Sequence, residues 1–283
     1  MEIVWNKKNY ESTLTREKNG VVWLEFKRFC EKGFPLLHAY STRLGGVSSG
    51  VVGSMNLRNC EYDSRENYEK NMHLFFDAVG FTFDNIVASH QTHTNNVHVV
   101  RRGDVPTGTL FGREFQDIDG LVTNLRHVPL VCSFADCIPL YFYAGDVNAI
   151  GISHGGWRGC VSDIAGETVR ALVREYGADV KNIYAGIGPG ICQDCYEVST
   201  DVYEKFAEEL GKEELGRVFR DGREGHFQLD LWEANRIFML RAGIPEGNIT
   251  VTDICTRCNS DKLFSHRVKG FKRGNQIGVM ELI

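Results

Sequence analysis

Apolar residues recur every three or four positions in four segments of the chain, the spacing that places them on one face of an α-helix. Residues that favour helix ends frame these segments. The first segment begins at Asp63, which with Glu66 resembles a capping box, and it ends at Gly80. The pattern predicts helices over residues 63–80, 163–177, 202–210 and 230–243, each with its apolar face packed in the core.

Short runs rich in β-branched and aromatic residues, bounded by turn residues, predict eight strands. These strands outnumber the helices and often follow one another directly, which favours an α+β fold of layered, mixed sheets over strictly alternating strands and helices. The runs are Val21–Phe26, Val97–Val100, Val128–Phe134, Ile138–Tyr143, Ala149–Ser153, Ile183–Ile187, Ile249–Thr252 and Gln276–Leu282.

Two stretches rich in glycine and charge, residues 101–120 and 211–228, are predicted to form long surface loops. Neither a linker nor an internal repeat interrupts the 283 residues. Hydrophobic residues make up 42% and charged residues 24% of the chain, which is typical of a globular protein and excludes collagen, coiled coils and disordered tails. We therefore predict a single domain over residues 1–283.

The charge balance argues against a nucleic-acid partner, because 32 Lys and Arg against 37 Asp and Glu give a net charge of -5. The sequence has no run near the roughly 20 apolar residues that cross a bilayer. Its first residues also lack the basic start and apolar stretch of a secretory signal, so we expect a cytoplasmic protein without a membrane partner. The odd number of cysteines, nine, then predicts reduced thiols.

Residues able to bind a metal gather near the ends of predicted strands. Cys137 lies between two such strands, His154 directly follows another, and His93 belongs to a His-Gln-Thr-His segment. A thiolate and two imidazoles suit Zn²⁺, with copper as the alternative metal, and three protein ligands leave a fourth position open for catalysis. The spacing matches no zinc-finger pattern, so a buried thiol beside two hydrogen-bonded histidines is the competing interpretation.

Two Cys-x-x-Cys pairs, at Cys192 and Cys195 and at Cys255 and Cys258, are a second candidate metal site. Zinc ribbons usually separate their pairs by about 15–20 residues, whereas 59 residues lie between Cys195 and Cys255. Neither pair opens a helix after a strand, as a redox pair does. We therefore predict buried free thiols here.

Two glycine-rich segments are candidate anion sites. Gly186–Gly190 lacks the Gly-Lys-Ser/Thr signature of a P-loop and is predicted to form a tight turn. Arg43 lies beside Gly45 and Gly46, and a guanidinium next to flexible glycines suits either an anion clamp or a packed turn.

Taken together, these segments resemble a family first labelled multicopper polyphenol oxidoreductase (laccase-like) and later reassigned as purine nucleoside phosphorylase with adenosine deaminase activity. The resemblance spans nearly the whole chain. Its motifs are Thr42-Arg43-x-Gly45-Gly46-Val47-Ser48, Met55-Asn56-Leu57, Gln91-x-His93, Asp119-Gly120-Leu121-Val122-Thr123, Ala135-Asp136-Cys137-x-Pro139, His154-x-Gly156-Trp157-Arg158-Gly159, Gly188-Pro189-x-Ile191, Cys195-Tyr196-Glu197-Val198, Asp230-Leu231-x-x-Ala234-Asn235, Cys255-Thr256 and Phe264-Ser265-His266-Arg267.

The resemblance implies that His93, Cys137 and His154 bind one catalytic zinc ion in an α/β/β/α layered fold without a flavin or nicotinamide. The chain departs from the family near its end, where Val268 follows Arg267 and the segment 272–275 replaces a Gly-Arg pair. This departure leaves the role of the C-terminal basic residues open.

The resemblance also implies purine nucleoside and phosphate as substrates. The expected reactions are phosphorolysis of adenosine, inosine, guanosine or methylthioadenosine to base and ribose-1-phosphate, and hydrolytic deamination of adenosine through a metal-activated water attacking C6.

We predict catalytic roles for Cys137, Asp136 and Arg43. Asp136 would act as a proton shuttle, although a turn-capping role is as plausible for it. Substrate contacts are predicted for Arg43, Asn56, Gln91 and Arg158, with a structural ion pair as the alternative for Arg158. Because C6 and C1′ lie at opposite ends of a nucleoside, either two substrate orientations or two roles of zinc are needed.

Two other enzyme classes remain open. In the first, Cys137 is a metal-free nucleophile activated by His154, giving an amide or ester hydrolase. In the second, copper oxidises phenols, although one His-Cys-His set offers few ligands for a multicopper cluster. A third alternative is a protein that binds a ligand without catalysing a reaction.

Overall fold

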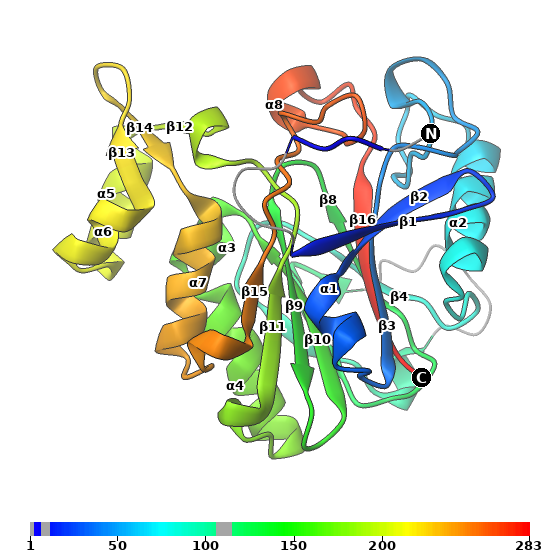
Figure 1. Cartoon of the computed structure of the whole chain (residues 1–283), viewed down its shortest axis with the longest axis horizontal. Helices are drawn as coiled ribbons and strands as arrows, with labels where there is room; N and C mark the ends of the chain where they lie inside the picture. The colour runs from blue at the N-terminus through cyan, green and yellow to red at the C-terminus, as the bar shows by residue number, and fades with distance from the viewer. Residues whose placement is uncertain (1–2, 7–11, 106–114) are drawn as a thin grey trace.

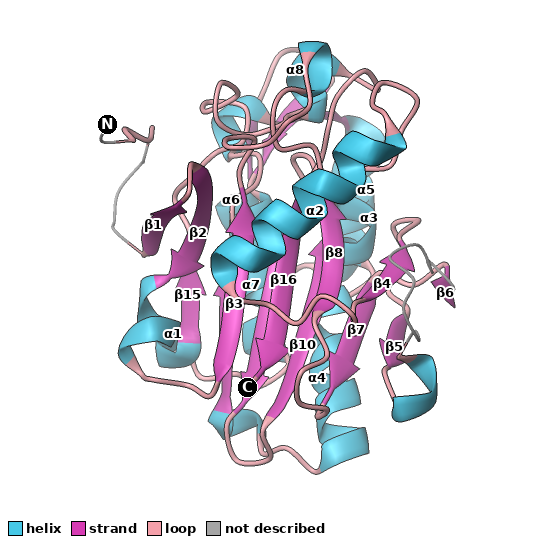
Figure 2. Ribbon diagram, turned by 90° about the vertical axis from the view of Figure 1, so that its right-hand side faces the viewer, coloured by secondary structure: helices cyan, strands magenta, loops and turns pink. Residues whose placement is uncertain are grey.

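The structure is a computed structural model that describes residues 3–6, 12–105 and 115–283. Its elements stack as helix, sheet, sheet and helix layers (Figures 1 and 2), which confirms the layered α/β/β/α fold with mixed sheets. The first sheet runs, in spatial order, β1 (Thr13–Lys18), β2 (Val21–Phe26), β3 (Leu36–Ser41), β16 (Gln276–Leu282), β8 (Leu130–Phe134), β4 (Val87–His90) and β6 (Phe115–Gln116).

The second sheet packs face to face on the first, with β10 contacting β16 and β8. Side chains from both sheets, among them Phe134, Tyr141, Ile152 and Met280, form a buried apolar layer between them. The strands of the second sheet, in spatial order, are β15 (Ile249–Val251), β11 (Ile183–Ile187), β9 (Ile138–Ala144), β10 (Ala149–Gly155), β7 (Gly120–Thr123) and β5 (Val97–Val99).

Helices cover the outer faces of both sheets. The helix α2 (Arg65–Val79) lies across the first sheet (Figure 2), and α4 (Ile164–Tyr176) packs on β10, β7 and β5 of the second. Beside the second sheet stands a small sheet of β12 (Glu197–Ser199), β14 (His226–Leu229) and β13 (Phe219–Asp221). The other α-helices of the described residues are α1 (Lys27–Glu31), α3 (Trp157–Val161), α5 (Thr200–Glu209), α6 (Lys212–Val218), α7 (Leu231–Arg241) and α8 (His266–Lys269).

The four predicted helices are confirmed as α2, α4, α5 and α7. Gly80 and Gly177 end two of them in the left-handed conformation, which glycine adopts at little cost. The predicted capping box at Asp63 is wrong, because Ser64 is the capping residue and its hydroxyl accepts from the backbone N–H of Asn67. Asp63 instead accepts a hydrogen bond from Ser48.

The prediction of a loop over residues 211–228 is wrong, since this stretch contains α6, β13 and the start of β14. These elements are too short to show a period in the sequence. Their ends are held by contacts such as that of Glu214, whose carboxylate accepts from the backbone N–H of Gly211. Part of the other predicted loop, residues 106–114, lies outside the described residues.

All eight predicted strands are confirmed, but others were missed, notably β1, β3, β4 and β7. Those in the middle of a sheet, such as β3 and β7, are almost wholly buried and therefore lack an alternating pattern. Among the described residues, none of the helices is long and apolar enough to cross a bilayer. The single domain over residues 1–283 stays a prediction.

Candidate metal centre and its pocket

Strand pairing explains why His93, Cys137 and His154 meet. β4 pairs in parallel with β8, so the chain segments that follow both strands leave from the same edge of the first sheet. Cys137 lies in the bend from β8 to β9, and β9 pairs with β10 so that His154 opposes Pro139. Three segments that are distant in the sequence therefore end at one point.

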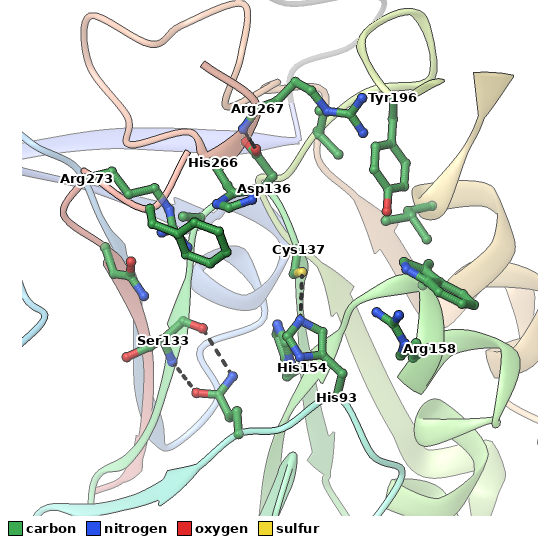
Figure 3. Close-up of a pocket in the computed structure, with 17 residues that line it drawn as sticks. His93, Ser133, Asp136, Cys137, His154, Arg158, Tyr196, His266, Arg267 and Arg273 are labelled. Atoms are coloured by element: carbon green, nitrogen blue, oxygen red, sulfur yellow. Dashed lines mark hydrogen bonds between the residues drawn. The ribbon is translucent and has the colours of Figure 1, made fainter. Parts of the chain in front are cut away.

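The three potential ligand atoms lie within 4.8 Å of one another. The Cys137 Sγ and His93 Nε2 atoms are 4.0 Å apart, and the His93 and His154 rings meet edge to face with centroids 4.8 Å apart (Figure 3). Gly156 leaves room for this group, since a Cβ atom there would lie 3.1 Å from both Cys137 Sγ and His93 Cδ2. The backbone of His93 is left-handed, with φ 68°, a conformation that costs a non-glycine residue of order 1–3 kcal/mol and is concentrated at functional sites.

Asp119 supports the group from behind. Its buried carboxylate accepts from His154 Nδ1 at 2.8 Å, which leaves His154 Nε2 for the centre. The same carboxylate accepts the backbone N–H groups of Thr92, His93 and Thr94 at 3.0, 3.1 and 2.8 Å. Asp119 therefore fixes both the His154 ring and the loop that carries His93, as carboxylates behind metal-binding histidines do. The sequence had marked Asp119 only as part of a motif.

The electrostatics of the centre favour a thiolate. Burial by itself raises the pKa of Cys137, but the charge and hydrogen bonds of His154, together with His93, outweigh it and lower the pKa to about 6. Burial likewise disfavours the charged form of His154, yet Cys137 and Asp119 raise the pKa of that imidazole well above its ordinary value. The Asp119 carboxyl keeps a pKa of about 2 against its own burial, because His154 and the backbone N–H groups bind its anion.

The centre opens into a cavity of about 510 Å³, a size typical of small-molecule sites. Three arginines line it, and Figure 3 shows Arg158, Arg267 and Arg273 on different sides of Cys137. Asp136 is the only carboxylate among the described lining residues. The cavity is therefore basic in a chain whose net charge is -5. Its apolar walls come from Ala135, Trp157, Ile191, Tyr196, Leu231 and Phe271.

Two residues predicted to contact substrate lie elsewhere. The guanidinium of Arg43 donates to the carbonyl oxygens of Gly53 and Ser260 and faces the ring of Phe264 at 4.8 Å. Asn56 is fully buried, and its side-chain amide forms hydrogen bonds with neighbouring chain segments. Neither lines the cavity. This placement argues against substrate or phosphate contact, because the donors of Arg43 are already bound to carbonyl groups.

The other predicted residues line the cavity. Gln91 exchanges two hydrogen bonds with the backbone of Ser133, at 2.8 and 3.1 Å. Asp136 accepts from Thr256 Oγ1 and from the Arg267 backbone N–H, both at 2.6 Å, contacts that fit the capping role better than a proton shuttle. Arg158 is exposed and lies over the Trp157 ring at 4.4 Å. The described residues provide no ion pair for Arg158.

Sequence reasoning missed most of the C-terminal wall of the cavity. His266, Arg267, Phe271, Arg273 and Asn275 all line it, so the segment whose role was left open contributes directly. The Nε of Arg273 is buried and has no hydrogen-bond partner among the described residues. The signal that could have located this wall is the group of four Lys and Arg side chains between residues 267 and 273, with the exposed Phe271 among them.

Comparisons with known proteins agree with this geometry. Residues 37–283 match the sequence model of the family described as multi-copper polyphenol oxidoreductase laccase. The chain belongs to this family. Its relatives include a protein named purine nucleoside phosphorylase YlmD from Geobacillus stearothermophilus, 33% identical over 80% of this chain and 83% of the relative. Another relative, named adenosine deaminase RL5, from an unknown prokaryotic organism, is 32% identical over 84% of this chain and 91% of its own.

The fold comparison leads to the same family. The crystal structure of YlmD from Geobacillus stearothermophilus superimposes with a TM-score of 0.86 at 30% identity, covering 94% of this chain and 97% of that one. Although the laccase label suggests copper, the described residues gather only two groups of potential metal ligands, His93 with Cys137 and His154, and four cysteines. Neither group is the histidine-rich set that a multicopper cluster needs, so the copper oxidase alternative is not favoured.

Proposed function

We propose that this member of the laccase-like family is a zinc-dependent purine nucleoside phosphorylase that also deaminates adenosine. The observation that carries the proposal is that one cavity combines the His93, Cys137 and His154 group with three arginines and aromatic walls. The names of the relatives supply the substrate class. Phosphorolysis would convert nucleoside and phosphate to free base and ribose-1-phosphate, and deamination would convert adenosine and water to inosine and ammonia.

The donor set fits zinc. Metal binding needs a deprotonated thiol and a neutral imidazole, and the site favours the first by lowering the pKa of Cys137. Asp119 sets the tautomer of the second, because its hydrogen bond holds the proton of His154 on Nδ1 and leaves the lone pair of the neutral ring on Nε2. Bound zinc supplies Lewis acidity and lowers the pKa of a bound water towards about 7. The set holds three protein ligands, which is the number that leaves a position for solvent or substrate.

Arginines provide the phosphate site in this proposal. Arg273 offers a buried Nε without a partner, and Arg158 keeps its donors free of carboxylates among the described residues. Arg267 uses two donors on the Glu197 carbonyl and lies over the Tyr196 ring at 5.0 Å. Planar guanidinium groups bind phosphate oxygens strongly. Their positive charge would also stabilise the departing purine anion.

Aromatic side chains provide the base site. Trp157 and Tyr196 are half-buried in the wall, whereas Phe271 is 77% exposed at the cavity and meets the His266 ring edge to face. An exposed aromatic ring at a polar cavity suits stacking against a purine. Since C6 and C1′ lie at opposite ends of the nucleoside, deamination and phosphorolysis would place different ends of the substrate at the centre or use the metal differently.

The direct test incubates zinc-replete protein with adenosine, with and without phosphate. When phosphate is absent, chromatography should show inosine as the product. When phosphate is present, it should also show adenine, hypoxanthine and ribose-1-phosphate. Cys137→Ser should abolish both reactions, and Cys30→Ser, which changes an exposed thiol away from the cavity, should leave both unchanged. Absence of every product from metal-replete, folded protein would overturn the proposal.

A second candidate function follows from one specific contact chain. Asp119, His154 and Cys137 have the arrangement of a cysteine hydrolase triad, with an orienting carboxylate, a base and a thiol of lowered pKa. His93 discriminates between the two functions, because a metal site needs it and a triad does not. Hydrolysis of amide or ester substrates by metal-free protein, retained in His93→Gln, would support the triad, and loss of all activity on chelation would exclude it.

A further inference from the structure

A second group of thiols lies behind the cavity wall. The Sγ atoms of Cys192, Cys195, Cys255 and Cys258 all lie within 4.8 Å of one another. Cys192 and Cys255 are buried, Cys195 is half-buried and Cys258 is exposed, and none of the four is in a disulfide bond. None of them lines the cavity, so the function proposed above does not use them. The sequence analysis considered the two Cys-x-x-Cys pairs as one metal site but predicted buried thiols instead, because 59 residues separate the pairs.

The topology explains why the two pairs meet. β11 and β15 are parallel neighbours whose register joins residues 64 positions apart, such as Ala185 with Ile249. The same alignment continues past the strands, where Gly190 forms a bridge with Cys255 and its carbonyl accepts from Thr256. In a parallel arrangement, two copies of one motif at nearly this offset come side by side. The two cysteine pairs are offset by 63 positions and therefore face each other.

The sulfur positions suit a tetrahedral metal. A zinc–sulfur distance of about 2.3 Å in a tetrahedron places the sulfur atoms roughly 3.8 Å apart. The Cys195 and Cys258 Sγ atoms are 3.5 Å apart, a separation well beyond the disulfide bond length of about 2.05 Å. Four thiols around one point form the soft donor set that selects zinc over hard cations such as Mg²⁺ or Ca²⁺.

Hydrogen-bond donors surround the sulfur atoms. The backbone N–H groups of Cys192 and Cys258 both point at the Cys255 Sγ, at 3.3 and 3.5 Å. The Arg257 side chain hydrogen-bonds with the half-buried Cys195, and its positive charge also acts on the exposed Cys258. Hydrogen bonds and a nearby positive charge stabilise the charged form of a group. A tetrathiolate zinc centre carries a net charge of about −2, and Arg257 offsets part of it.

We propose that Cys192, Cys195, Cys255 and Cys258 bind a structural zinc ion, distinct from the catalytic centre. Four protein ligands close the coordination sphere, so this site holds no position for substrate. The ion joins two segments that build the cavity. Tyr196, directly after Cys195, lines the wall, and Thr256 donates to Asp136 at 2.6 Å. Loss of the ion would release both segments together.

The test measures zinc per chain in full-length protein purified under reducing, anaerobic conditions without added metal. Mass spectrometry of the metal content should give two zinc ions for the native sequence and one for Cys137→Ser. The double variant Cys195→Ser/Cys258→Ser should also fall to one. Cys30→Ser is the matched control, since Cys30 is exposed like Cys258 but lies outside both groups, and it should keep two.

X-ray absorption at the zinc edge of Cys137→Ser gives a readout that does not depend on the folding of the double variant. This spectrum should show four sulfur ligands per zinc. One zinc in the native protein and none in Cys137→Ser would overturn the proposed structural site while leaving the catalytic proposal intact. A disulfide between Cys195 and Cys258, detected by thiol labelling of the same preparation, would overturn it as well. Conversely, one tetrathiolate zinc without nucleoside turnover would support this site and overturn the proposed function.

Discussion

Replacing Asp119 with asparagine should weaken metal binding at the proposed catalytic centre by exchanging one carboxylate oxygen for an NH₂ group. In the native site, one carboxylate oxygen accepts from His154 Nδ1 and the His93 N–H, at 2.8 and 3.1 Å. The other oxygen accepts from Thr92 N–H at 3.0 Å and from the N–H and hydroxyl of Thr94 at 2.8 and 3.0 Å. A carboxamide has only one accepting oxygen. We expect this oxygen to face the three donors of Thr92 and Thr94, which leaves the NH₂ group on the side of His154.

The amide NH₂ of Asp119→Asn then faces His154 Nδ1. His154 must accept there, so its proton moves to Nε2 and that nitrogen loses its lone pair for a metal. Keeping the native tautomer instead would leave two donors facing each other in a buried site, at a cost of about 1–3 kcal/mol. Both routes agree with the tenfold to hundredfold loss of metal affinity seen when such supporting groups are removed, about 1.4–2.7 kcal/mol.

Competition with a chromophoric chelator measures this loss, and circular dichroism checks that the variant is folded. Asp117→Asn is the matched control, because Asp117 is exposed in the same loop and accepts from Thr92 Oγ1 at 2.8 Å without contacting His154. Folded Asp119→Asn protein with the zinc affinity of the control would refute this account of the centre. Equal losses in both variants would show that the loop, rather than the His154 tautomer, sets the affinity.

Three further outcomes are expected. Burial lowers the pKa of His38 to about 4. As the pH falls from about 6.5 to 4, the unfolded chain therefore binds a proton that the folded chain does not, and the free energy of unfolding drops by about 3 kcal/mol. Urea titrations should show a smaller drop in His38→Gln, and the same pH dependence in both proteins would contradict this account. Gly156→Ala adds a methyl group 3.1 Å from the Cys137 Sγ and should lower zinc content by crowding the ligands, whereas Gly103→Ala, which meets only open space, should not. Arg158→Ala should raise the KM for phosphate about tenfold, worth about 1.4 kcal/mol, and leave phosphate-free deamination close to native; equal effects on both reactions would remove Arg158 from the phosphate site.

Local patterns in the sequence determined much of the secondary structure. Three predicted strands, Val21–Phe26, Ile183–Ile187 and Gln276–Leu282, have the same bounds in the structure. Helix ends at Asp163 and Asp230 were also predicted, since side-chain caps and helical periodicity are properties of neighbouring residues. The prediction that the metal-binding residues follow strand ends needed only the positions of those strands.

Which strands become neighbours was decided by the tertiary structure. A strand exposes the same row of N–H and C=O groups whatever its partner, so its own sequence does not name the strand it pairs with. The parallel pairing of β11 with β15 brought Cys192 and Cys195 to Cys255 and Cys258, against the expectation from their spacing. In the same way, the carbonyl groups that bind Arg43 and the cavity that Arg273 lines exist only after folding. The sequence therefore pointed to Arg43, which lies outside the cavity, and left the role of Arg273 open.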